Sequence, residues 1–267
     1  SSFDPDGAVV INDTGADVDF RVESDTNANS LFVQGSNGAV GLGVSSIATN
    51  NALHIENGES YLVMKDAQQM GIKLYGDDTN VIYSYDKTAD SITGGVTWAH
   101  ADGTTIFYTG GTNARMTIDS TGAVTMPAQP AFLVNAASST SNLALLLHTK
   151  VNFNNEIFDQ NADFNTSTQT FTAPVTGKYQ FNVQLLWLNW DSGANFYYLQ
   201  LQTSNRTHYE LYTGSERSSD IQYCYGHVHV LADMDAGDTA HVTIYQAGGS
   251  VQTGYDNQSI FSGYLAC

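Results

Sequence analysis

The sequence has 267 residues, enough for one large or two ordinary domains, and its 42% hydrophobic content is typical of a folded chain. Nine Lys and Arg residues against 27 Asp and Glu residues give a net charge of -18, which argues against nucleic acid and anionic membranes as partners, since both attract clustered basic side chains. No apolar run approaches the length of a membrane span, so we expect no membrane insertion. Charged residues are only 13% of the chain, and the aromatic residues and 24 glycines predict an all-β fold.

The first segment, residues 1–58, contains short alternating stretches separated by polar turns. We expect strands at residues 8–11, 18–22, 31–33, 39–42 and 53–55. Each strand offers only two or three apolar side chains to an interior, too few to bury a core within one chain. Neighbouring copies are therefore expected to complete the core of a β-rich fibre shaft segment.

The second segment, residues 59–129, continues the same pattern. We expect strands at residues 61–64, 72–75, 81–85 and 105–108, and a closing strand, turn and strand over residues 116–126. Gly122-Ala123-Val124 in that closing stretch repeats Gly38-Ala39-Val40 after a strand and a polar turn. The repeated unit resembles the shafts of bacteriophage tail fibres and tail spikes, which implies an intertwined trimeric β shaft. Pro127 and Pro130 indicate a linker, and we place a domain boundary there.

The third segment, residues 130–267, carries the clearest strand pattern. Between residues 179 and 187 the large apolar side chains alternate onto one face: Tyr179, Phe181, Val183, Leu185 and Trp187. In the turn before them Pro174 fixes φ and Gly177 is expected to take a positive φ, so that this turn sets the register between strands at Phe171 and Tyr179. Later strands are expected at residues 196–201, 221–231, 240–246 and 259–265.

Spaced motifs in this segment point to a family. The letters N-E-x-x-D-x-N-x-x-F-N fall on residues 155–165 and F-x-A-P-x-x-G-x-Y-x-F on residues 171–181, with Pro130-Ala131-Phe132, Ala236-Gly237-Asp238 and a closing Phe261-Ser262-Gly263-Tyr264-Leu265. This pattern resembles the head domain of the complement C1q-like family over residues 130–267. The resemblance implies a jelly-roll β-sandwich of about ten strands in two sheets, assembled as a trimeric knob.

The sequence contains no recognisable catalytic arrangement. The G-x-S-x-G, H-E-x-x-H and phosphate-loop motifs are absent, so we predict that the protein is not an enzyme. A depolymerase tail spike is a third functional class, but it needs a defined pair of carboxylates that the sequence does not reveal. His227 and His229 lie two apart in a strand and could share a metal ion, although such pairs are more often surface or packing groups.

Counting antiparallel strands back from the closing strand places three loops at the free tip of the knob, at residues 189–195, 233–237 and 248–257. The predicted receptor-binding residues, from these loops and from Tyr209, are Trp190, Asp191, Tyr209, Tyr255, Asp256 and Asn257. The predicted metal ligands are Asp191, Asp233 and Asp235, since crowded carboxylates bind hard cations such as calcium. The C1q-like resemblance implies calcium near this apex. The alternative is an acidic tip that holds no cation.

Two leucines bear on assembly. Leu186 and Leu188 are expected to point away from the inward-facing alternation, and apolar residues on an outer face need a partner surface. A homotrimer supplies that surface.

A fibre-like shaft before a C1q-like head predicts the C-terminal part of a bacteriophage tail fibre or other receptor-binding protein, located on the virion and acting outside the cell. Its trimeric knob would adsorb to a host-surface glycan or protein by avidity, and its N-terminal end would join other virion tail proteins. The alternative is a secreted C1q-like binding module of a cellular organism. The absence of a collagen-like Gly-x-y tract and of a signal peptide favours the fibre, and the start at Ser1 indicates a processed chain or a fragment.

Overall fold

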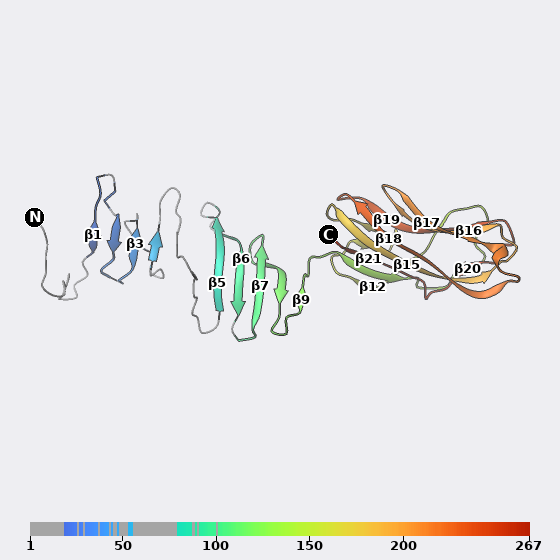
Figure 1. Ribbon diagram of the computed structural model, residues 1–267, viewed down its shortest axis with the longest axis horizontal. Helices are drawn as coiled ribbons and strands as arrows, with labels where there is room; N and C mark the ends of the chain where they lie inside the picture. The colour runs from blue at the N-terminus through green and yellow to red at the C-terminus, as the bar shows by residue number, and fades with distance from the viewer. Residues whose placement is uncertain are drawn as a thin grey trace, which may run out of the picture. The chain divides into compact units, whose positions relative to one another are not determined.

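The computed structural model describes residues 19–25, 27–28, 30–36, 38–42, 44, 47, 53–55, 79–86, 89, 91–99 and 101–267. These residues form β-strands and one short 3-10 helix, η1 (Gly214–Glu216), which confirms the predicted all-β class (Figure 1). The chain divides into two compact units, residues 1–73 and 74–267. The strands expected at residues 8–11, 61–64 and 72–75 lie outside the described residues.

The first unit contains a four-stranded sheet of very short strands. In sheet order they are β1 (Phe20–Val22), β2 (Leu31–Val33), β3 (Val40–Leu42) and β4 (Leu53–Ile55), antiparallel except for the parallel pair β3–β4. Phe32, Ala39, Val44 and Ile47 form a small buried cluster. The expectation that one chain buries no core in this segment is therefore too strict, because these four side chains do pack within one copy.

The second unit begins with a five-stranded antiparallel meander. Its strands are β5 (Thr79–Asp86), β6 (Ser91–Ala99), β7 (Thr104–Thr109), β8 (Asn113–Ile118) and β9 (Val124–Thr125). We did not predict β6, because Gly94 and Gly95 interrupt its apolar pattern. A Cβ atom at Gly95 would collide with the carbonyl oxygen of Ile82 on β5, so glycine here permits close strand approach. The meander pairs within one chain, and its trimerisation stays a prediction.

Residues 131–265 form a β-sandwich of two six-stranded sheets (Figure 1). The first sheet contains β10 (Ala131–Asn135), β12 (Asn155–Asp159), β15 (Gly177–Trp190), β18 (Ile221–Met234), β20 (Gly254–Tyr255) and β21 (Ile260–Leu265). The second contains β11 (Thr149–Lys150), β13 (Phe164–Asn165), β14 (Thr170–Thr172), β16 (Phe196–Thr203), β17 (Thr207–Thr213) and β19 (Thr239–Ala247). The four later strands predicted from the sequence are confirmed. We refer to this sandwich as the head.

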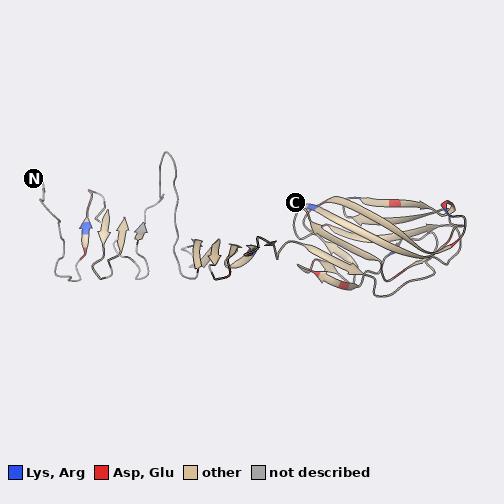
Figure 2. Cartoon of the chain, turned by 60° about the horizontal axis from the view of Figure 1, so that its bottom comes forward, with Lys and Arg blue, Asp and Glu red and all other residues tan. Residues whose placement is uncertain are grey.

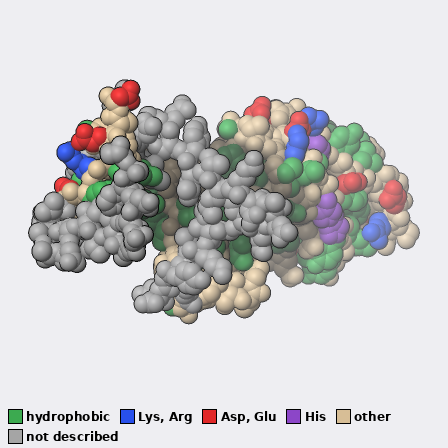
Figure 3. Space-filling model, turned by 60° about the vertical axis from the view of Figure 1, so that its left-hand side comes forward, with side chains coloured by type: hydrophobic (Ala, Val, Ile, Leu, Met, Phe, Trp, Pro, Cys, Tyr) green, Lys and Arg blue, Asp and Glu red, His purple; other side chains and the backbone are tan. Residues whose placement is uncertain are grey.

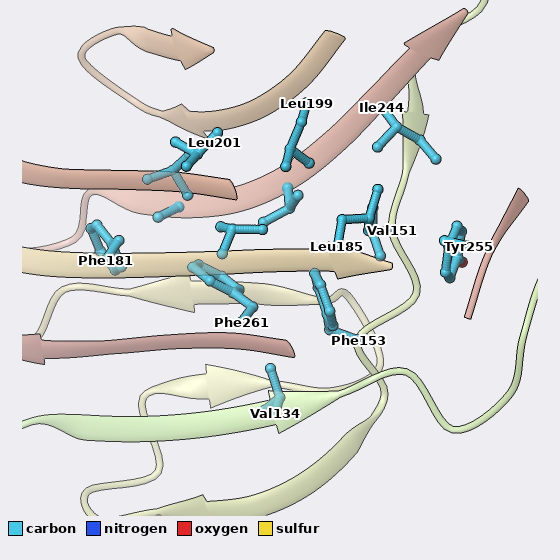
Figure 4. Close-up of a cluster of buried hydrophobic side chains, with 14 of the residues drawn as sticks. Val134, Val151, Phe153, Phe181, Leu185, Leu199, Leu201, Ile244, Tyr255 and Phe261 are labelled. Carbon is cyan, nitrogen blue, oxygen red and sulfur yellow. The ribbon is translucent and has the colours of Figure 1, made fainter. Parts of the chain in front are cut away.

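The core of the head lies between the two sheets and follows the period-two pattern of the strands. Phe181 and Leu185 of the first sheet point towards Leu199 and Leu201 of the second (Figure 4). The five alternating side chains predicted to face inward on β15 are all at most 1% exposed. Phe132 stacks on both Phe164 and Phe171 with ring centroids 5.0 Å apart, which ties the first strand of the head to the opposite sheet.

The turn before β15 differs from its prediction in two respects. Gly177 does not have the expected positive φ. It is instead packed so closely that a Cβ atom would lie 2.7 Å from the carbonyl oxygen of Cys267. In addition, β14 and β15 belong to different sheets, so the turn carries the chain across the sandwich and sets no register between them. Tyr179 fixes this crossing by donating a hydrogen bond from its hydroxyl to the Val175 carbonyl oxygen, at 2.8 Å.

Candidate functional site

Most of the predicted receptor-binding residues at one end of the head are structural. Trp190 and Tyr255 are each 2% exposed, and Asp191 is 5% exposed. The Trp190 ring packs on Tyr197 with centroids 3.9 Å apart, and the Tyr255 hydroxyl accepts a hydrogen bond from the Asn152 amide, at 3.0 Å. These three side chains are therefore not accessible to a receptor, and the corresponding site prediction is wrong for them.

Asp191 connects two loops of this end. Its Oδ1 atom accepts a hydrogen bond from the Gly193 amide at 2.7 Å, and its Oδ2 atom accepts one from the Ser250 amide. The loops at residues 189–195 and 248–257 therefore do meet, as the strand count predicted. A buried carboxylate satisfied by backbone amides stabilises such a junction.

The turn after Tyr255 is polar and partly accessible. Asp256 accepts a hydrogen bond from the Ser139 hydroxyl at 3.0 Å, and the Asn257 amide donates to the same hydroxyl oxygen at 3.1 Å. The Asn257 side chain is exposed. Of the predicted receptor-binding residues, Asn257 and Tyr209 thus remain available at the surface.

The three aspartates predicted as metal ligands do not lie together. In the register of the β15–β18 ladder, Asp233 lies opposite Lys178 at one end. Trp190, which precedes Asp191, lies opposite Ile221 at the other end. Asp233 forms a salt bridge with Arg206, with the nitrogen and oxygen 2.8 Å apart. The loop at residues 233–237 lies at the opposite end from the other two loops, so the predicted ligand set is wrong. Calcium elsewhere on an assembled head stays a prediction.

The described residues offer no complete metal site within one copy. No group of three or more His, Cys, Asp or Glu side chains in that part of the chain could hold an ion.

A polar pocket of about 420 Å³ lies beside the loop junction. It is lined by Asn189, Asp220, Ile221, Gln222 and Gln252. Asp220 accepts hydrogen bonds from the Gln252 side chain at 2.9 Å and from the Ser192 amide and hydroxyl at 2.9 and 2.8 Å. The Gln252 bond first, and then those from Ser192, hold the pKa of Asp220 below its usual value. This carboxylate therefore holds Gln252 and Ser192 in position at the edge of the pocket.

The outer face of the second sheet carries a group of half-buried and exposed apolar side chains, most of them aromatic. On β16 and β19 the inward residues alternate with outward ones, so Tyr198 pairs with Tyr245 on one side and with Leu211 on the other. We call this the aromatic surface; its members are Phe196, Tyr198, Tyr209, Leu211 and Tyr245. Tyr209 is 58% exposed and Leu211 is 49% exposed.

Ring contacts hold the aromatic surface in a defined arrangement. The Tyr198 ring lies edge-on to Phe196 and Tyr209, with centroids 5.1 and 5.2 Å apart, and 6.0 Å from Tyr245. Aromatic pairs in this geometry are mutually stabilising, so the surface is preformed.

A hydrogen-bonded group of amides and a hydroxyl lies beside the aromatic surface; Gln202 is partly accessible, and Gln200 and Thr243 are buried beneath it. The Gln202 side chain donates hydrogen bonds to Gln200 at 3.3 Å and to the Thr243 hydroxyl at 3.0 Å, and Thr243 donates to Gln200 at 3.1 Å. The face thus combines flat apolar rings with uncharged hydrogen-bonding groups, and Figure 2 shows how sparse charged residues are along the strands of the head.

Sequence reasoning identified Tyr209 but assigned most of the aromatic stretch around it, including Tyr198, to the core or to contacts between copies, and it did not consider Phe196, Leu211 or Tyr245. Tyr198 lies in one aromatic-rich stretch with Trp187, Trp190, Tyr197 and Tyr212, whereas the structure places those four rings inside or partly inside the core. The alternation of β16 separates Tyr198 from Tyr197, Leu199 and Leu201 but does not say which face is buried; the structure places those three at the core, which sends Tyr198 outward. The same alternation on β19 sends Tyr245 outward.

Comparison with known proteins identifies the head. The model of the C1q domain matches residues 131–266. The globular domain of zebrafish complement 1qA protein is 20% identical over 52% of this chain and 98% of that chain, with a TM-score of 0.40. No curated protein matches the chain. Among the described residues no helix has the length and apolar character to span a membrane.

Proposed function

The chain belongs to the C1q domain family, and from this premise we propose that its head is a non-enzymatic module that binds a glycan on a cell surface. C1q domains are binding modules that typically form trimers and act outside the cell. The aromatic surface is the observation that carries the proposal. It is a preformed, accessible cluster of rings on the head, and it includes Tyr209 from the sequence prediction.

Glycans suit this surface chemically. A pyranose ring has an apolar face of C–H groups that stacks on aromatic side chains, and its hydroxyls need uncharged donors and acceptors. Tyr198, Tyr209 and Tyr245 supply rings with hydroxyl tips, and the partly accessible Gln202 amide lies beside them. Gln200 and Thr243 are buried and hold the Gln202 side chain in place by hydrogen bonds. The net charge of -18 disfavours anionic polymers as ligands, so a neutral or basic glycan is the expected class.

Assembly would use the outer face of the first sheet. Tyr223, Tyr225 and Leu231 on β18 are 56%, 52% and 56% exposed, and Tyr264 on the same face is 49% exposed. Residues 179–190 of β15 and 221–232 of β18 include no Asp, Glu, Lys or Arg. Copies with the same negative charge can therefore approach through this face with little repulsion. We propose a homotrimer on this basis, and it leaves the aromatic surface facing outward.

Leu186 and Leu188 contribute less to this proposal than the sequence suggested. Both project from β15 on the outer side, but Leu186 is only 5% exposed within a single copy. The apolar side chains that need a partner are those on β18.

We further propose that the chain is the C-terminal part of a bacteriophage tail fibre or similar attachment protein. Its support is the two sheets before the head, which leave apolar side chains exposed: Val22, Leu53, Ile82, Phe107 and Val124. Further copies of a fibre would cover such residues. The alternative is a secreted module of a cellular organism, and imaging of virions labelled with an antibody to the head distinguishes the two.

Binding of the full chain to an array of bacterial surface glycans tests the head's role. Tyr198→Ala and Tyr209→Ala should each weaken binding by about tenfold or more, because truncated central contacts commonly cost more than 1 kcal/mol. Tyr83→Ala, an exposed tyrosine on β5, is the matched control and should bind like the parent. Unchanged binding in both head variants would overturn the assignment of the surface.

A further inference from the structure

Two histidines lie side by side on the outer face of the first sheet. His227 and His229 on β18 are both exposed, and their rings are nearly parallel, with centroids 5.8 Å apart and an interplanar angle of 17°. Tyr225 stacks on His227 with centroids 6.1 Å apart. In Figure 3 histidine side chains reach the surface of the head beside hydrophobic ones. The two imidazoles thus belong to the face proposed for assembly.

A hydrogen bond prepares one of these rings as a metal ligand. The Nδ1 atom of His229 lies 3.1 Å from the Oδ1 atom of Asn182, which also accepts a hydrogen bond from the Gln180 amide at 3.3 Å. Because an amide oxygen only accepts, Nδ1 of the neutral ring carries the proton and Nε2 has the free lone pair. An outer partner that fixes the tautomer in this way is typical of metal-binding histidines.

The surroundings favour a particular class of ion. Opposite the two histidines β15 places Gln184 and Asn182, and β18 adds Tyr225 and Leu231, so no carboxylate competes or contributes. Calcium and magnesium prefer oxygen ligands, whereas imidazole nitrogens select zinc, nickel, copper and iron. A site built from these histidines would therefore take a divalent transition metal.

One copy cannot complete such a site. Two parallel rings 5.8 Å apart project in the same direction and do not converge on one point. A tetrahedral or octahedral ion needs at least two further ligands. A trimer that places this part of β18 at its threefold axis would bring three pairs of imidazoles together. Burying them without a partner would be costly, and an ion between the copies satisfies their lone pairs.

We propose that His227 and His229 from the three copies bind a divalent transition-metal ion between the copies of the head. The proposal rests on the homotrimer of the proposed function. It adds a metal-dependent element of assembly, because an ion bound only by the trimer stabilises the trimer by mass action.

Metal content and mass of the full chain test the proposal together. The protein is stripped with a chelator, incubated with Zn²⁺ or with Co²⁺, freed of excess ion and analysed by elemental analysis and light scattering. The parent should be a trimer that retains fewer than one ion per chain, with a higher melting temperature than the stripped protein. His227→Gln and His229→Gln should retain no ion and show no rise in melting temperature on metal loading. After incubation with Co²⁺, these variants should lack the visible absorption band of the Co²⁺-loaded parent.

The matched control is His241→Gln, which removes a histidine from the outer face of the second sheet and should behave as the parent. A trimer that retains no ion, or retains it in both variants, overturns the metal site and leaves the homotrimer standing. One ion per chain on a monomer overturns the shared site and the homotrimer. A monomer without metal overturns both.

Discussion

The carboxylates of Asp191 and Asp220 fasten the loops at one end of the head. Asp191 holds the amides of Gly193 and Ser250, and Asp220 holds Ser192 and Gln252. Together they join the end of β15 to the segments before β18 and β20. Asp191, which the sequence suggested as a metal ligand, and Asp220, to which it gave no role, therefore hold together the loops beside the pocket.

The lowered pKa of Asp220 predicts a pH dependence with a definite sign. Its folded-state pKa lies below the unfolded value of about 4. The folded chain therefore holds this proton more weakly, and the stabilisation is present above the unfolded value and is lost as pH falls through the folded one. Asp220→Asn should melt below the parent at pH 7, and the two melting temperatures should converge towards pH 3.

Gln252→Ala provides the second arm of that experiment, since the Gln252 hydrogen bond is the largest cause of the shift. At pH 7 the melting temperature of Gln252→Ala should lie between those of the parent and Asp220→Asn. A gap between parent and Asp220→Asn that is equally large at pH 3 and pH 7 would show that the carboxylate contributes no pH-dependent stability.

Gly177 predicts a stability effect that arises from packing. A Cβ atom there would lie 2.7 Å from both the Cys267 carbonyl oxygen and Leu265 Cδ1. We expect Gly177→Ala to lower the free energy of unfolding by about 1 to 3 kcal/mol, the range of overpacked sites. Val175→Ala in the same turn, at a side chain 46% exposed, should change it by less than about 0.5 kcal/mol. Chemical denaturation of both variants gives the comparison, and equal stabilities would exclude the close contact.

At the scale of elements, strand alternation predicted much of the head and little of its surface. The inward face of β15 was correct, because the large apolar residues recur every second position with polar ones between them. On β16 and β18 aromatic or aliphatic residues occupy both faces, so alternation alone did not show which face is buried. Tyr198 and Tyr225 are assigned to the surface only by the pairing of their strands.

Strand pairing also explains the error at the predicted metal site. Asp233 lies near the C-terminal end of β18, and only β19 separates the loop at residues 233–237 from the loop at residues 248–257, so these two loops lie at opposite ends of the head. Long-range register of this kind depends on which strands pair, and the period-two pattern does not contain that information. The expected grouping with Asp191 failed for this reason.

The outer face of β18 yields a matched pair of variants for assembly. Leu231 and Leu147 are each 56% exposed, but only Leu231 lies on the face proposed to meet other copies. Leu231→Asp should raise the dissociation constant of the trimer by at least tenfold, because it buries an unpaired charge in each interface. Leu147→Asp should leave the mass unchanged at equal concentration. Sedimentation of the two variants measures whether each remains a trimer. Dissociation of both variants, or of neither, would contradict the assigned interface.

At the scale of the whole molecule, the two sheets of the head have different tasks in the proposed assembly. The first sheet offers copies a stretch of β15 and β18 without Asp, Glu, Lys or Arg on which to meet, and the second keeps its rings outward for a ligand. Repetition of a modest site around an axis raises the effective affinity without any new contact. Shaft and head would thus act together as a multivalent attachment device.

The homotrimer is the state on which this arrangement depends, and the mass of the full chain in solution tests it most directly. Light scattering at micromolar concentration should give three times the chain mass of 28.8 kDa. A folded, stable species of 28.8 kDa would contradict the homotrimer and the multivalent attachment that depends on it.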